Sequence, residues 1–317
     1  MKRLFFMIFA MLFGLRFSSC SSGFLYTNKD PLEFSEINYG YNVKYISENP
    51  RLAYIDEGEG EVVLLVHGLA SNAGFWRYNI PELSKRFRVI AVDLPGYGKS
   101  EKGNYSYKMT FFAEVIKKFL DELKIEKVNF IGHSMGGQIG IHFAIKYPER
   151  IQKLILASPA GFEQFRRGEG EWLKNAVTVK SVKSTNEEGV RRNLMNNFYN
   201  WDTKLEWMVE ERVRMAKAKD FDLFARAVSR SVAGMIDEPT FNKLHLIRSK
   251  TLVIYGKNDE LIPNPYLHPG FTSDVFKKGK EVNENIELYE IKECGHMIMM
   301  EKPNEFNDVV LDFLLMK

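Results

Sequence analysis

Short runs of apolar residues, rich in β-branched side chains, alternate along the chain with segments whose apolar residues repeat at the period of a helix. This alternation is typical of βα units and predicts an α/β fold with a mostly parallel central sheet and helices on both faces. The run VVLLV at 62–66 is apolar at every position, as expected of a central strand that helices cover on both sides. The predicted strands are Val43–Ile46, Leu52–Ile55, Val62–Val66, Arg88–Val92, Val128–Ile131, Lys153–Ala157, Thr251–Tyr255 and Ile286–Ile291.

The alternation stops between residues 161 and 249, where charged residues interleave with aromatic ones and no strand-like run occurs. Because a strand returns at Thr251, we expect a helical cap inserted into a core made of residues 41–160 and 250–317. A separate domain is the alternative. A second insertion, Pro263–Asn285, is rich in Pro, Gly and Lys and is predicted to be a loop. Helices of the core are predicted at Phe111–Leu123, Met135–Tyr147 and Asn304–Leu315.

The N-terminus has the features of an export signal. Three residues that include Lys2 and Arg3 precede an apolar run over Leu4–Leu15, which is too short to span a bilayer. Small residues and then Cys20 follow, and this resembles the lipobox of bacterial lipoproteins. The resemblance implies a signal peptide over residues 1–20, acylation of Cys20, and an exported protein anchored to a membrane of the bacterial cell envelope, with residues 21–40 as a linker. An ordinary secretory signal and an uncleaved anchor are the alternatives.

The charge is balanced, with 44 basic and 41 acidic residues and a net charge of +3. Proteins that bind nucleic acids usually have a clustered basic face, and no such cluster is present in the sequence. We therefore expect a small-molecule ligand rather than nucleic acid.

The segment GHSMG at 132–136 matches the pattern G-x-S-x-G. A predicted strand runs directly into it and a helical pattern leaves it, which is the strand-turn-helix context of a nucleophile elbow. In an elbow, the flanking glycines let strand and helix approach without Cβ clashes. The pattern predicts that Ser134 is a nucleophile at the carboxyl edge of the sheet; an ordinary Gly-rich turn is the alternative.

A serine nucleophile that attacks a carbonyl needs two donors for the oxyanion, each worth about 100- to 1,000-fold in rate. The backbone N–H of Met135, which follows the nucleophile, is one candidate. The loop after strand 62–66 begins with His67-Gly68, and the N–H of Leu69 in this loop is the other.

A serine also needs a base. Of six histidines, only His296 follows a late strand through a Gly-containing turn, which delivers it to the carboxyl edge of the sheet. His133 is next to the nucleophile but is expected to point elsewhere, and His142 lies inside the following helix. The remaining candidates are His67, His245 and His268.

The base needs an orienting carboxylate. Asp259 leaves the strand TLVIY directly and reaches the same edge, which places the groups in the chain order Ser134, Asp259, His296. Glu260 is adjacent but should point away, and Glu163 is the alternative acid.

Two other motifs are rejected. Gly98-Lys99-Ser100 matches the last three residues of the phosphate-binding loop motif, but Asp93 occupies the position where that motif has its first glycine. Cys294 and His296 have no second pair at a zinc-like spacing, so no metal site is expected, and the chemistry proposed for Ser134 requires no cofactor.

The segments LLVHGLAS, VIAVDLPGYGKS, FIGHSMGG, SPAGFE, LVIYGKNDELIP and CGHMIMMEKP occur in the order found in α/β-hydrolases, so the chain resembles that family over about 41–315. The resemblance implies the triad Ser134, Asp259 and His296 with Leu69 and Met135 as oxyanion donors. The motifs look most like monoacylglycerol lipases, and are also similar to the hydrolases that cleave ring-opened aromatic products at a carbon–carbon bond. The latter commonly have Asn before the serine, where this chain has His133.

The expected activity is hydrolysis of a carboxylic ester through an acyl-enzyme, and a lipid-like ester of the monoacylglycerol type is one candidate substrate. A carbon–carbon bond hydrolase, a peptidase and a non-catalytic binding module on the same fold are the alternatives. The aromatic residues of the insertion either line an apolar acyl pocket or only pack the cap onto the core.

Overall fold

The computed structural model describes residues 25–47 and 49–316. An eight-stranded sheet runs through this part of the chain in the order β1-β2-β4-β3-β5-β6-β7-β8. The pairs β1–β2 and β2–β4 are antiparallel and all the others are parallel, which confirms the predicted sheet. The strands are β1 (Lys44–Ile46), β2 (Leu52–Glu57), β3 (Val62–Val66), β4 (Arg88–Val92), β5 (Val128–His133), β6 (Ile151–Ala157), β7 (Thr251–Gly256) and β8 (Ile286–Ile291).

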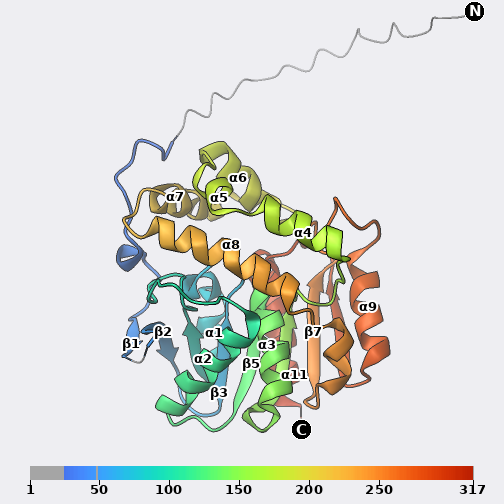
Figure 1. Ribbon diagram of the computed structural model, residues 1–317. Coiled ribbons are helices and arrows are strands. Elements are labelled where there is room, and N and C mark those ends of the chain that lie inside the picture. Colours follow the sequence, from blue (N-terminus) through green and yellow to red (C-terminus); the bar gives the residue numbers. More distant parts are fainter. Residues whose placement is uncertain (1–24, 48, 317) are drawn as a thin grey trace, which may run out of the picture.

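Helices cover the sheet on both faces (Figure 1). On one face α2 (Met109–Glu122) packs against α3 (Met135–Lys146), which contacts β5 and β6. On the other face α1 (Ile80–Leu83) contacts α11 (Pro303–Leu315), and the short α10 (Ile298–Glu301) precedes α11. All residues of β3 and β5 are buried, because helices shield these central strands from water on both sides.

The segment between β6 and β7 is helical and lies over the carboxyl edge of the sheet (Figure 1). Its longest helix, α8 (Phe221–Asp237), crosses above the sheet and contacts α2 below as well as α4 (Arg167–Ala176) and α5 (Val179–Lys183) above. We call this segment the cap. Its helices are α4 (Arg167–Ala176), α5 (Val179–Lys183), α6 (Glu187–Met195), α7 (Glu206–Met215) and α8 (Phe221–Asp237).

The expectation of a loop over Pro263–Asn285 is wrong, because this segment contains helix α9 (Thr272–Val282). The helix buries Phe276 completely against Tyr255 and Phe162. Gly279, a residue that suggested a loop, is required by packing: a Cβ there would lie 2.3 Å from the ring of Phe162. The prediction from composition was wrong because Gly279 allows a close contact with Phe162, and the lysines lie on the solvent-exposed face of α9.

The predicted signal peptide and Cys20 lie outside the described residues. The described part of the expected linker packs on the core, because Phe34, Ile37 and Tyr39 are buried. None of the helices between residues 25 and 316 has the length and apolarity needed to cross a bilayer.

Candidate active site

Ser134 occupies a strained turn between β5 and α3, with φ 53° and ψ −115°. The flanking glycines make this turn possible. A Cβ on Gly132 would lie 2.3 Å from the carbonyl oxygen of Gly136, and a Cβ on Gly136 would lie 2.4 Å from that of Val66. The serine is therefore held at the amino end of α3, at the carboxyl edge of the sheet, where the helix dipole favours negative charge.

His296 and Asp259 meet at the same edge, although 37 residues separate them in the sequence. Asp259 follows β7 and His296 follows β8; Asp259 Oδ2 lies 2.7 Å from His296 Nδ1. The other carboxylate oxygen, Oδ1, accepts the backbone N–H groups of Leu261 at 2.8 Å and Ile262 at 3.2 Å. Asp259 is an acceptor, so Nδ1 carries the proton and Nε2 is left as the basic nitrogen.

Ser134 and His296 line one cavity. No hydrogen bond joins the serine hydroxyl to the imidazole among the interactions of the described residues, and such bonds often form only once a substrate is bound. The cap holds the loop that carries His296, which we call the His296 loop. The backbone carbonyl oxygen of Asn197 in the cap accepts the N–H groups of His296 at 2.8 Å and Met297 at 3.1 Å.

The two backbone groups expected to bind an oxyanion lie beside Ser134. Met135 is the first residue of α3, so its N–H has no carbonyl one turn earlier in the helix. Leu69 lines the cavity in the loop after β3. That loop passes close to the nucleophile, since a Cβ on Gly68 would lie 3.2 Å from the Cβ of Ser134.

His67 holds this loop in place. Its Nε2 accepts the N–H of Leu94 at 3.0 Å, and its Nδ1 donates to the carbonyl oxygen of Gly68 at 2.8 Å. Burial lowers the pKa of His67 to about 4, so the ring is neutral and acts as a structural bridge.

His133 does not point away from the site as expected. It lines the cavity, its ring centroid lies 4.9 Å from that of His296, and its Nε2 donates to the carbonyl oxygen of His296 at 3.1 Å. Burial holds the pKa of His133 well below its ordinary value, and the nearby His296 lowers it further. The His133 imidazole is thus neutral and supports the His296 loop.

Two polar features at the cavity have no counterpart in the predicted site residues. Arg212 of α7 lines the cavity and donates to the carbonyl oxygen of Ala70 in the loop after β3. His268 bridges the carboxylates of Glu163 and Glu169, at 2.6 and 3.3 Å, and so joins the β7–α9 loop to the cap. Glu163, the alternative acid, thus pairs with His268, whereas Asp259 pairs with His296. No sequence motif marks either feature, because each depends on contacts between distant segments.

The cavity has a volume of about 820 Å³ and lies between the cap and the carboxyl edge of the sheet. Its walls are largely apolar, and the cap contributes most of them. The apolar lining residues of α4, α5, α7 and α8 include Leu173, Ala176, Val182, Met208, Phe224, Val228, Val232 and Ile236. Within residues 25–47 and 49–316, no group of three His, Cys, Asp or Glu side chains is placed to hold a metal ion.

Comparisons with known proteins agree with this architecture. The family model described as alpha/beta hydrolase fold matches residues 61–303. A 2-hydroxy-6-oxo-6-phenylhexa-2,4-dienoate hydrolase of Comamonas testosteroni is 31% identical over 268 residues, which cover 82% of this chain and 90% of the relative.

Two solved structures are also similar. A probable hydrolytic enzyme from Pseudomonas aeruginosa PAO1 superposes with a TM-score of 0.80 at 25% identity, over 90% of this chain and 99% of that chain. A membrane phospholipase A, described as a bacterial virulence factor, has a TM-score of 0.68 at 25% identity, over 87% of this chain and 86% of that chain. With a family model that spans most of its length, this chain belongs to the α/β-hydrolase fold family.

Proposed function

We propose that this protein is a serine hydrolase that cleaves carboxylic esters with an extended apolar acyl group. The observation that supports this most strongly is the cavity of about 820 Å³, which has Ser134 and His296 in its wall and an otherwise largely apolar lining. Each CH₂ that such a cavity removes from water contributes about 0.8 kcal/mol, so a long acyl chain binds better than a short one.

In the proposed reaction, His296 Nε2 takes the hydroxyl proton of Ser134 while the serine oxygen attacks the ester carbonyl carbon. The negative oxygen of the tetrahedral intermediate accepts the N–H groups of Leu69 and Met135. His296 then gives its proton to the leaving alcohol, and an acyl-enzyme remains on Ser134. Water attacks the acyl carbon as it loses a proton to His296, and the proton returns to the serine oxygen when the carboxylic acid leaves.

A second candidate is hydrolysis of a carbon–carbon bond, and the named relatives favour it over ester hydrolysis. The Comamonas testosteroni relative is named for a substrate that contains a carboxylate and a phenyl group. Arg212, a guanidinium in the cavity wall, is suited to a carboxylate, and the apolar lining is suited to a phenyl ring. His133 counts against this candidate, because the carbon–carbon hydrolases commonly have Asn at that position.

Assays of both substrate classes on the same preparation separate the candidates. The full chain and Ser134→Ala are assayed on p-nitrophenyl esters from acetate to palmitate and on 2-hydroxy-6-oxo-6-phenylhexa-2,4-dienoate. The proposal predicts ester turnover that rises with chain length beyond acetate and disappears in Ser134→Ala. Turnover of the dienoate alone would replace it with the second candidate, and no turnover of either would favour a binding module.

The position of the acyl chain is tested by narrowing the cavity. Val232 on α8 faces the cavity, whereas Arg226 on the same helix is exposed. Val232→Trp is expected to shift the preferred ester toward shorter chains, and Arg226→Trp is expected to leave the preference unchanged. An unchanged preference in Val232→Trp would place the acyl chain elsewhere.

A further inference from the structure

Large apolar side chains are exposed beside the cavity. Trp172 on α4 is 48% exposed, and from the loop between β7 and α9 Tyr266 is 82% and Phe271 75% exposed. Leu261 in the same loop is 38% exposed, and the rings of Trp172 and Tyr266 lie 6.3 Å apart. Leu261 and Tyr266 also line the cavity. We call these four exposed residues, three of which belong to the β7–α9 loop, the apolar rim. Exposed apolar groups gathered in this way are typical of a binding surface rather than of scattered surface residues.

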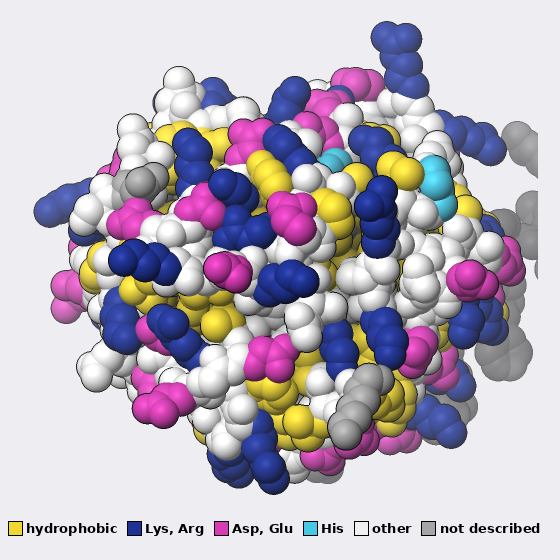
Figure 2. All heavy atoms as spheres, turned by 90° about the horizontal axis from the view of Figure 1, so that it is seen from below, with side chains coloured by type: hydrophobic (Ala, Val, Ile, Leu, Met, Phe, Trp, Pro, Cys, Tyr) yellow, Lys and Arg dark blue, Asp and Glu magenta, His cyan; other side chains and the backbone are white. Residues whose placement is uncertain are grey.

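Exposed basic side chains lie in the same stretch of the cap as Trp172. Residues 164–184, which include α4 and α5, contain five basic and two acidic residues, and two of the basic residues, Lys174 and Lys183, form ion pairs with Asp237 and Asp222 of α8. Arg166, Arg167 and Lys180 of this stretch are exposed. On the face opposite the cap, acidic and basic side chains are interspersed (Figure 2). Aromatic and basic side chains together are suited to the headgroup region of a bilayer that contains anionic phospholipid.

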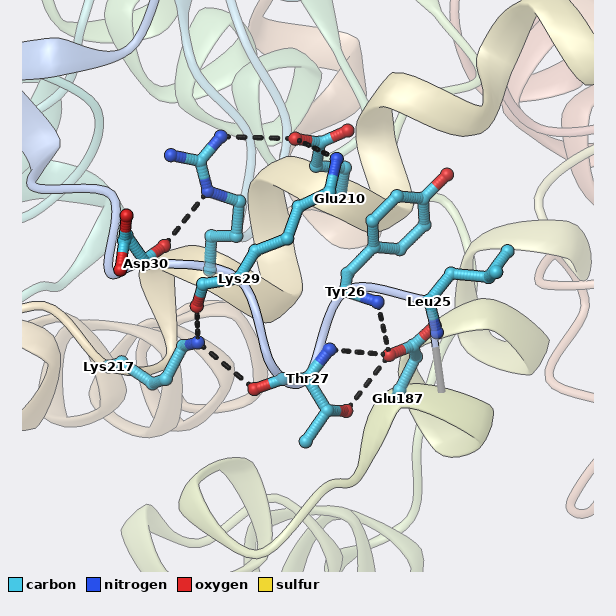
Figure 3. A network of polar contacts seen from close by, with 9 residues as sticks. Leu25, Tyr26, Thr27, Lys29, Asp30, Glu187, Glu210 and Lys217 are labelled. Atoms are coloured by element: carbon cyan, nitrogen blue, oxygen red, sulfur yellow. Dashed lines mark hydrogen bonds and ion pairs between the residues drawn. The ribbon is translucent and has the colours of Figure 1, made fainter. Parts of the chain in front are cut away.

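The first described residues, Leu25–Thr27, form hydrogen bonds with the cap. The carboxylate of Glu187 on α6 accepts the backbone N–H groups of Leu25, Tyr26 and Thr27, each at 2.9 Å (Figure 3). Lys217, which follows α7, donates to the carbonyl oxygen of Thr27 at 3.1 Å. Leu25, the first described residue, is therefore held at the cap.

From these three observations we infer that the cap face with the apolar rim docks on the surface of a bilayer containing anionic phospholipid, so that the mouth of the cavity meets the lipid. The inference deepens the proposed function, because it makes a lipid ester supplied from the bilayer the substrate. Docking itself requires no catalysis and can be measured separately.

Quenching of tryptophan emission by brominated phosphatidylcholine reports which face meets the bilayer. The full chain is mixed with vesicles of brominated phosphatidylcholine and phosphatidylglycerol. Docking predicts strong quenching, most of which is lost in Trp172→Phe. The matched control is Trp207→Phe, since Trp207 is partly buried against Arg77, with 3.6 Å between the guanidinium and the ring centroid. Equal quenching in the wild type and Trp172→Phe would overturn the inference, even if the N-terminal segment holds the protein on the vesicle.

A second comparison tests the contribution of the rim to binding. Trp172→Ser/Phe271→Ser is expected to lower the vesicle partition coefficient about tenfold. Tyr45→Ser/Leu246→Ser removes two apolar side chains that are 44% and 46% exposed outside the rim and is expected to have little effect. Equal partition of the two variants, or no preference for phosphatidylglycerol over pure phosphatidylcholine, would contradict docking. Hydrolysis of soluble p-nitrophenyl butyrate should be equal in both, and its absence in every variant would instead refute the proposed function.

Discussion

Among the single residues of the site, Asp259 determines which nitrogen of His296 carries the proton, because both of its carboxylate oxygens accept hydrogen bonds. Asp259 Oδ2 accepts from His296, and Oδ1 is held by two backbone N–H groups. The carboxylate therefore cannot rotate without breaking three hydrogen bonds. This arrangement fixes both the orientation and the tautomer of the imidazole.

Replacement of Asp259 by Asn tests this role. The amide can present its NH₂ group to His296 and so favour the wrong tautomer, and kcat is expected to fall about 10⁴-fold. Glu260→Gln is the control, because Glu260 is adjacent and exposed and should keep wild-type activity. Steady-state kinetics on the preferred ester measure kcat for both variants. A decrease in kcat of less than about tenfold in Asp259→Asn would exclude the orienting role.

The glycines of the elbow give a second test at this scale. Gly136→Ala places a Cβ 2.4 Å from a backbone carbonyl oxygen that cannot easily move, and we expect a loss of about 1–3 kcal/mol in the free energy of unfolding. Gly168→Ala in α4 is the control, since its Cβ meets nothing within 4 Å and alanine favours the helix. Denaturant unfolding of both variants should show destabilisation only in the first; equal stabilities would argue against the elbow geometry.

The sequence predicted the individual residues with a local signature better than those without one. Ser134, Asp259 and His296 each follow a strand, and that position alone directs them to the carboxyl edge. The orientation of His133 toward His296 could not be predicted, because it depends on the packing of two loops that are 163 residues apart. Arg212 likewise joins the site only through the fold of the cap.

At the scale of elements, the strands follow from their apolar, β-branched runs, and α9 shows where such reasoning fails. Its glycine is buried under Phe162 and its lysines face water, so composition resembles that of a loop. The cap was predicted as helical, and an apolar pocket beneath it was one of two alternatives. The residues that line the cavity could not be predicted, because they come from several short helices whose arrangement no periodicity encodes.

The attachment of the N-terminal segment to α6 should depend on pH. Burial raises the pKa of Glu187, but the hydrogen bonds from Tyr26, Thr27 and Leu25 outweigh it, and the pKa falls below its ordinary value of 4.5. The stabilisation is therefore complete above the ordinary value and is lost as the pH falls through the lowered pKa. Hydrogen-exchange protection of the amides of Tyr26 and Thr27, corrected for the intrinsic rate at each pH, should decrease in that acidic range.

Two variants serve as controls for this prediction. Glu187→Gln should show weak protection at every pH, whereas Glu188→Gln, which alters an exposed neighbour, should behave like the wild type. Protection that does not change with pH in the wild type would show that the carboxylate does not hold the segment.

At the scale of the whole molecule, the parallel order of β3, β5, β7 and β8 gathers the loops that carry Leu69, Ser134, Asp259 and His296 at one edge. The cap closes over this edge and supplies most of the apolar wall. The sheet thus positions the groups used in the proposed reaction, and the cap forms most of the wall around the proposed acyl site. Because the two parts meet only in the folded chain, neither sequence segment alone predicts the shape of this cavity.

Covalent labelling with a fluorophosphonate, followed by peptide mass spectrometry, tests directly whether Ser134 is the nucleophile. We expect one adduct, on the peptide that contains Ser134, which is absent in Ser134→Ala and forms much more slowly in His296→Ala. A folded protein that forms no adduct, or an adduct on a different serine, would contradict it.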